Sequence, residues 1–160
     1  MVNQKIYRNA TLIALIVVVL LVVGVLVVNK GFGVDRSSSA RSSVTQFGLE
    51  MQKVSLLSPD ASSTIATIYG PLATKEMIRA WQEDIEHAPG RLTSSPWPAG
   101  IDIINISKQG SGYIVSGNVV FATSDGVVGT TPVVIQVVPV DGKWLIGAYQ
   151  EQVATTTKAK

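Results

Sequence analysis

The sequence contains no cysteine and only one histidine, His87, among its 160 residues. Without cysteine there is no disulfide scaffold, no thiol catalysis, no cysteine zinc site and no lipid anchor on cysteine. One histidine excludes a histidine-built metal centre and a two-histidine mechanism within one chain. A glycine-rich phosphate loop, HExxH, EF-hand spacing and a Gly-x-Ser-x-Gly elbow are also missing. We therefore expect no metal and no cofactor.

Charged residues are scarce, at 15% of the chain, and the basic excess is small. The isoelectric point near 9.0 arises close to the amino end. From Gly31 onward there are ten Lys and Arg against eleven Asp and Glu. No basic stripe interleaved with aromatic residues follows, so we expect no nucleic-acid partner.

The sequence contains one long apolar run: residues 10–28 are nineteen residues without a charge. At roughly 1.5 Å per residue they span about 28 Å, close to the hydrocarbon thickness of a bilayer. We predict a transmembrane helix over 10–28, with the lipid bilayer as its partner. A cleaved signal peptide is the rival interpretation, with Ser38-Ser39-Ala40 as the nearest cleavage site. The run is longer than a typical signal-peptide core, which favours an uncleaved anchor.

The basic residues on the two sides of the predicted helix are nearly equal in number, so they give little indication of its orientation in the membrane. Lys5 and Arg8 precede the helix, while Lys30, Arg36 and Arg41 follow it. The serine-rich segment after the helix favours a single-pass protein of the cytoplasmic membrane, with residues 1–9 inside and the domain outside. We expect a flexible Ser/Gly linker over 29–43, a domain over 44–153 and a disordered tail over 154–160.

Three helical patterns open the expected domain. The first is an apolar stripe with spacings of three and four: Val44, Phe47, Met51, Val54 and Leu57. The second follows Ser58-Pro59-Asp60 and stops at Gly70-Pro71, with an inner face of Ile65, Ile68, Tyr69 and Leu72. The third follows a Thr74 cap, with Ile78, Trp81 and Ile85 as its stripe. Helical spacing predicts that the aromatic residues among them lie in the core.

Strand patterns follow the proline-rich loop 88–100. Apolar residues alternate from Ile101 onward, with turns at Gln109–Gly112 and Ser124–Gly126. A long strand over 127–140 then reaches Asp141-Gly142, a two-residue hairpin signal that leads into 143–150. Trp144 is expected to pack on the helices. Helices followed by an antiparallel meander predict an α+β fold, with about three helices on a curved four-stranded sheet.

This element order resembles the cone fold of the nuclear transport factor 2-like, ketosteroid isomerase-like and cystatin-like domains. It also resembles the periplasmic domains of single-pass assembly factors in bacterial secretion and conjugation systems. A narrower likeness is to small membrane-anchored bacterial proteins that carry the motifs of Val54–Ala61 and Ala88–Pro98. The resemblance implies a cone-like domain on an anchor, in a cell-envelope or secretion-type assembly, and brings no activity with it.

Two functions are open on the sequence. The first is a non-catalytic binding or scaffold module with a protein or cell-envelope partner. The second is a small-molecule sensor or an isomerase/dehydratase-like enzyme using the cone cavity, which needs a carboxylate or histidine inside. No carboxylate is paired by the pattern with Tyr113 or Tyr149, and His87 beside Glu86 is expected at a polar helix end. We expect no catalytic residue. The oligomeric state is open.

The loop over 88–98 is the candidate binding site. Its prolines, among them Pro96 and Pro98, restrict its conformations, so it can present Arg91 and Trp97 with little entropy to lose. Arg and Trp are favoured at interface hot spots. The alternative is that these side chains make contacts within the domain and bind no partner. In it, Trp97 plugs the open end of the cone while Arg91 pairs with Asp102 or Glu83.

Overall fold

The computed structural model of the chain describes residues 36–152, in which helices come first and strands last. The helices are α2 (Arg36–Glu50), α3 (Ala61–Tyr69) and α4 (Lys75–Glu83), with short 3-10 turns η1 (Met51–Lys53) and η2 (Ile85–His87). The strands are β1 (Trp97–Gln109), β2 (Gly112–Thr123), β3 (Gly126–Val140) and β4 (Lys143–Glu151). The predicted α+β class and the four-stranded meander are confirmed.

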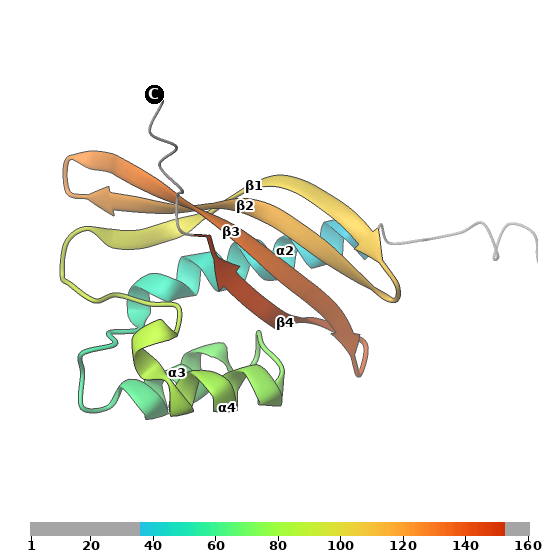
Figure 1. The fold of residues 1–160 in the computed structure, drawn as a ribbon, viewed down its shortest axis with the longest axis horizontal. Coiled ribbons are helices and arrows are strands. Elements are labelled where there is room, and N and C mark those ends of the chain that lie inside the picture. The colour runs from blue at the N-terminus through green and yellow to red at the C-terminus, as the bar shows by residue number, and fades with distance from the viewer. Residues whose placement is uncertain (1–35, 153–160) are drawn as a thin grey trace, which may run out of the picture. The chain divides into compact units, whose positions relative to one another are not determined.

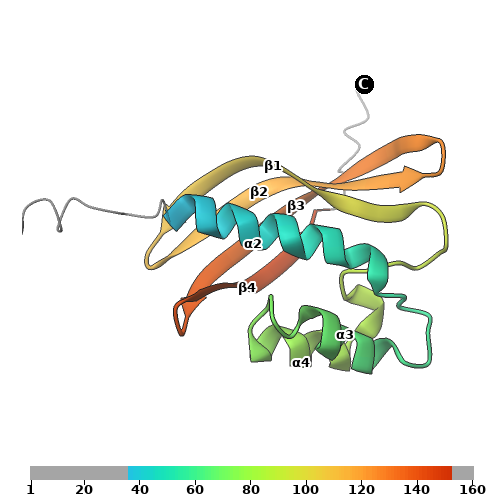
Figure 2. The same ribbon diagram turned by 180° about the vertical axis from the view of Figure 1, so that it is seen from behind.

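The four strands form one antiparallel sheet in the order β1-β2-β3-β4. Alternate residues of the two central strands are buried: Val115 and Val119 of β2, and Val133, Ile135 and Val137 of β3. α2 lies across this face of the sheet, and α3 and α4 lie side by side below it (Figures 1 and 2). The apolar alternation therefore faces the helices, as a sheet half-buried in an α+β domain requires.

An aromatic cluster fills the space between helices and sheet. The Phe47 ring lies 4.9 Å from Tyr69 and 5.8 Å from Trp81, measured between ring centroids. Tyr149 of β4 joins from the sheet, 5.7 Å from Phe47. Phe47, Tyr69 and Trp81 are buried, which confirms their prediction as core residues.

α2 begins earlier than the sequence pattern indicated, so the expected flexible linker over 29–43 is wrong in its second half. Residues 36–43 are helical, and Ala40 is fully buried. Ala40 continues the stripe of Val44 and Phe47 one turn towards the amino end, and burial outweighs the modest helix propensity of serine. At the other end the stripe is also shifted, because α2 stops at Glu50 and Leu57 is 73% exposed.

The hairpin at Asp141-Gly142 is confirmed. Both residues have positive φ, 48° and 77°, as a type I′ turn requires. β3 pairs with β4 from Val140 and Lys143 onward. Trp144 packs partly buried against the core and lies 5.3 Å from the Tyr113 ring, as expected for the helix-facing side.

The predicted anchor lies outside the described residues, as do segments 1–9, 29–35 and 154–160. Within residues 36–152, no helix has both the length and the apolar character needed to span a bilayer.

Candidate functional site

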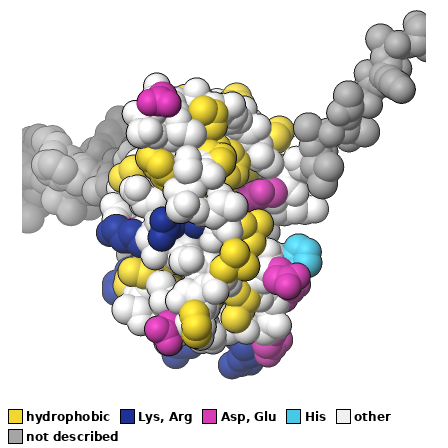
Figure 3. Space-filling model, turned by 90° about the vertical axis from the view of Figure 1, so that its left-hand side faces the viewer, with side chains coloured by type: hydrophobic (Ala, Val, Ile, Leu, Met, Phe, Trp, Pro, Cys, Tyr) yellow, Lys and Arg dark blue, Asp and Glu magenta, His cyan; other side chains and the backbone are white. Residues whose placement is uncertain are grey.

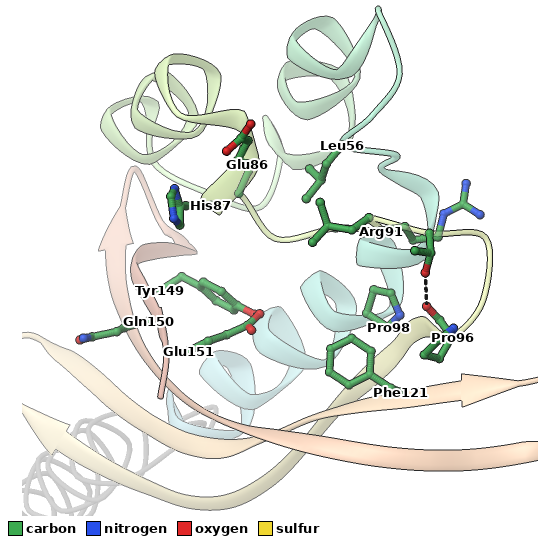
Figure 4. Close-up of a pocket in the computed structure, with 14 residues that line it drawn as sticks. Leu56, Glu86, His87, Arg91, Pro96, Pro98, Phe121, Tyr149, Gln150 and Glu151 are labelled. Carbon is green, nitrogen blue, oxygen red and sulfur yellow. Dashed lines mark hydrogen bonds between the residues drawn. The ribbon is translucent and has the colours of Figure 1, made fainter. Parts of the chain in front are cut away.

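A pocket of about 510 Å³ opens at the end of the domain where β4 stops (Figure 4). Its walls are formed by the loop after η2, the first residues of β1, the last residues of β4, and β2. The residues that line it are Leu56, Glu86, His87, Ala88, Gly90, Arg91, Leu92, Thr93, Pro96, Pro98, Phe121, Tyr149, Gln150 and Glu151. Figure 4 shows Phe121 and Tyr149 facing it from the sheet side.

The first part of the loop is held firmly by backbone contacts. The Arg91 N–H donates to the Val54 carbonyl at 2.7 Å, and the Leu56 N–H donates to the Arg91 carbonyl at 2.9 Å. The buried Tyr69 hydroxyl donates to the Pro89 carbonyl at 2.7 Å. Burial raises the pKa of Tyr69, so this hydroxyl remains a donor. The pocket therefore has one rigid wall, while residues 92–96 are exposed.

Three of the four predicted site residues line this pocket: Arg91, Pro96 and Pro98. The Ser95–Pro96 peptide bond is cis, and the Thr93 hydroxyl donates to the carbonyl oxygens of Ser95 and Pro96. Pro98 is buried and pairs with Phe121 across β1 and β2. The structure thus brings together the two ends of the proline-rich loop.

Trp97 does not belong to the pocket. It is the first residue of β1 and pairs with Ala122, so strand alternation turns it away from the face of Pro98 and Phe121. It is half-buried and is not among the side chains packed on the core. The expectation that Trp97 plugs the cone is therefore wrong. The predicted loop 88–100 is also too long, because β1 already begins at Trp97.

Arg91 makes no ion pair in residues 36–152, where the ion pairs are Lys53–Glu50 and His87–Asp84. The expected internal pair with Asp102 or Glu83 is therefore wrong. The Arg91 Nε atom is buried, and no acceptor among the described residues reaches it. A buried donor without an acceptor lowers stability, and because this atom is not exposed to the pocket it offers no contact to a ligand there.

Tyr149 and Glu151 form a pair that sequence reasoning missed. The Tyr149 hydroxyl donates to Glu151 Oε1 at 2.5 Å. Burial, and then the Glu151 charge, raise the pKa of Tyr149, so the phenol stays protonated. The signal was present in the spacing, because residues two apart on a strand share a face. The expectation that no carboxylate pairs with Tyr149 is therefore wrong.

His87 lies at the rim, as expected for a polar helix end. Its Nδ1 is 2.8 Å from Asp84 Oδ1, and its side chain is 81% exposed. The hydrogen bond to Asp84, with the Asp84 charge, raises the pKa of His87 above its ordinary 6.5. When His87 is protonated, Asp84 balances its charge.

The chemistry on offer is that of a binding surface. In residues 36–152 no charged side chain is buried, and no three metal-ligating side chains gather. Glu86, His87 and Glu151 reach the pocket from its exposed rim. Leu56, Phe121 and Pro98 supply apolar surface between them.

No family model and no curated protein matches the chain. In fold it is similar to a chain of the type VI native effector–immunity complex Tae3–Tai3 from Ralstonia pickettii. The TM-score is 0.45 at 14% sequence identity, and the match covers 72% of this chain and 97% of that one. A likeness of this size carries no argument about function.

Proposed function

We propose that the chain is a non-catalytic, single-pass membrane-anchored module whose extracytoplasmic domain binds a protein or cell-envelope partner. The observation that carries this proposal is the pocket beneath the proline-rich loop, which combines the apolar surface of Leu56, Pro98 and Phe121 with exposed carboxylates at its rim. A pocket with one rigid wall binds at a small entropic cost. Because its carboxylates are exposed, the alternative of a cavity enzyme has no buried base to rest on in residues 36–152.

Surface character at this end of the domain supports a macromolecular partner. Figure 3 looks onto it and shows hydrophobic side chains between separate acidic and basic ones, with His87 at one side. Leu92, which lines the pocket, is 54% exposed, and Leu57, next to the lining residue Leu56, is 73% exposed. Apolar surface rimmed by polar groups is typical of protein interaction sites.

The anchor and its orientation rest on the apolar run 10–28 and on the nearly neutral, serine-rich residues that follow. Protease added to intact spheroplasts is expected to remove a carboxy-terminal tag. A tag protected until lysis would reverse the orientation. An intact mass that begins at Arg41 would show cleavage and remove the anchor.

Site-specific crosslinking tests the pocket. We would replace Leu92 with the photoreactive p-benzoylphenylalanine in the full-length chain, expressed in membranes of its own host. Leu92 is 54% exposed and lines the pocket, so the probe is tolerated and faces a bound partner. The expected result is one discrete adduct.

The matched control places the same probe at Ile104, an aliphatic residue that is 67% exposed on β1 and does not line the pocket. It should give no such adduct. Equal adducts from both positions, or none from Leu92, would contradict docking at the pocket. An adduct with a small metabolite in place of a protein or wall polymer would favour the sensor alternative.

A further inference from the structure

β3 is longer than the strand that covers it. β4 pairs with β3 only from Val133 to Val140. Beyond that point, Gln152 N–H donates to the Pro132 carbonyl at 2.8 Å. In the described part of the chain, no strand pairs with the β4-facing edge of Gly126–Thr131. Among the described residues, about 20 Å of strand edge is therefore unpaired, at roughly 3.3 Å per residue, and we call it the open edge of β3.

The edge of β4, in contrast, is partly covered. The Ile146 N–H donates to the Leu72 carbonyl at 2.8 Å, and the Thr74 N–H donates to the Ile146 carbonyl at 2.9 Å. The α3–α4 connection thus occupies that edge. Proteins commonly cover or charge their sheet edges to prevent unwanted pairing. The open edge of β3 lacks both protections, because Gly126–Val140 contains no charged residue, and Val127 and Val128 are 69% and 58% exposed.

Thr130 is the residue best placed to pair with an added strand. The Pro132 carbonyl points towards β4, and the N–H and C=O groups of alternate strand residues point the same way. The N–H and C=O of Thr130 therefore face the open edge. A bulge between Phe121 and Ala122 bends the sheet next to Val128, which limits the regular edge to the residues around Thr130.

The open edge borders the candidate pocket. Gly129 pairs with Phe121, which lines that pocket, and a Cβ atom built on Gly129 would meet nothing within 4 Å. Tyr149 and Glu151, at the end of β4, line it from the other side. A strand laid beside Gly129 would continue the line of β4. Its side chains on the helix-facing side would point into the pocket.

Charges at the pocket favour a basic side chain there. Glu86 and Glu151 lie at the rim, and within residues 36–152 Glu151 has the neutral Tyr149 hydroxyl as its partner. Arg91 also lines the pocket, while His87, when protonated, is paired with Asp84. A Lys or Arg beside Glu151 would form a charge-assisted hydrogen bond with its carboxylate, whereas an acidic side chain would be repelled by it.

From these observations we infer that the open edge of β3 receives an extended strand of a protein partner, with a basic side chain in the pocket beside Glu151. Backbone pairing at Thr130 supplies affinity and the pocket supplies selectivity, as in other cases of strand addition. The inference rests on the proposed docking function and names the kind of partner. A second copy of this chain fits less well, because the copy's own edge strand, Gly126–Val140, contains no basic residue to place beside Glu151.

Peptide binding to the full-length chain tests the inference. The probe is a fluorescent peptide of alternating Val and Thr with one central Lys, about seven residues long. Two controls are matched to it: the same peptide with Glu in place of Lys, and the Lys peptide with N-methylated backbone amides. Fluorescence anisotropy at fixed salt should show binding of the Lys peptide, with the other two weaker by about tenfold or more.

Three variants locate the binding site on the molecule. Thr130→Pro removes the edge N–H without touching the β2 ladder and should weaken the Lys peptide by about tenfold. Thr130→Val keeps the N–H and should bind as the unchanged chain does. Glu151→Gln should remove most of the Lys-over-Glu preference. If Thr130→Pro does not fold, the N-methylated peptide still tests backbone pairing.

The remaining outcomes contradict the inference. Equal binding of Lys and Glu peptides overturns the basic partner. Absence of peptide binding, with the Leu92 adduct retained, overturns strand addition and leaves the docking pocket standing. Loss of both overturns the proposed function as well. A dimer dissociated by Thr130→Pro assigns the edge to a second copy. Binding that appears only after deletion of residues 153–160 assigns it to the chain's own carboxy-terminal segment.

Discussion

Two tryptophans of the domain differ sharply in their surroundings. Trp81 is 5% exposed and lies 5.8 Å from Phe47 and 5.4 Å from Tyr69, between ring centroids. Trp97 is half-buried and outside the core cluster. Residue type therefore says little about the contribution of each ring to stability.

We expect Trp81→Ala to lower the free energy of unfolding by about 3–5 kcal/mol, because it empties a filled aromatic site. Trp97→Ala should cost less than about 2 kcal/mol, since its ring adds no core packing. Urea unfolding followed by circular dichroism measures both. Equal losses would show that Trp97 is a core residue after all.

The His87–Asp84 pair predicts a titration. The Asp84 hydrogen bond raises the pKa of His87 above 6.5, so the stabilisation from this pair is complete below pH 6.5 and is lost as pH rises through the raised value. The NMR titration of the His87 ring should show a midpoint above 6.5. In Asp84→Asn the midpoint should fall. A midpoint that the substitution leaves unchanged would remove Asp84 as the cause.

At the level of elements, the β3–β4 hairpin depends on left-handed backbone. Gly142 has φ of 77°, and a Cβ atom there would meet nothing within 4 Å. The cost of Gly142→Val is thus conformational, about 1–2 kcal/mol in unfolding free energy. Gly129→Val is the matched control, because Gly129 also has open space but no positive φ. A thermal melt in which both variants behave alike would contradict the turn assignment.

Local signals predicted some element boundaries and missed others. Asp141-Gly142 is a local turn signal and Thr74 a local helix-cap signal, and both lie where predicted. The Met77 N–H donates to the Thr74 hydroxyl. The start of α2 at Arg36 carries no such signal, since serine suits both linkers and helices. The helical state of residues 36–43 is instead favoured by the burial of Ala40, and burial depends on the whole fold.

At the level of the described domain, the candidate site comes from unequal strand lengths. The sequence predicted loop 88–98 as a site and placed Arg91, Pro96 and Pro98 in it. It also predicted the unequal strands, 127–140 and 143–150, but not which strand residues meet the loop, because strand register depends on long-range pairing. The sequence therefore did not predict that Glu151, Phe121 and Tyr149 line the pocket.

Amide hydrogen exchange of the full-length chain, with and without the Lys peptide, tests most directly whether this end of the domain is the binding surface. Bound peptide should slow exchange around Thr130 and in residues 88–95, and leave the turns at Gly110 and Gly142 unchanged. The Glu peptide should have little effect at the same concentration. Protection confined to the turns, or no change around Thr130 at saturating Lys peptide, would contradict strand addition at the open edge of β3.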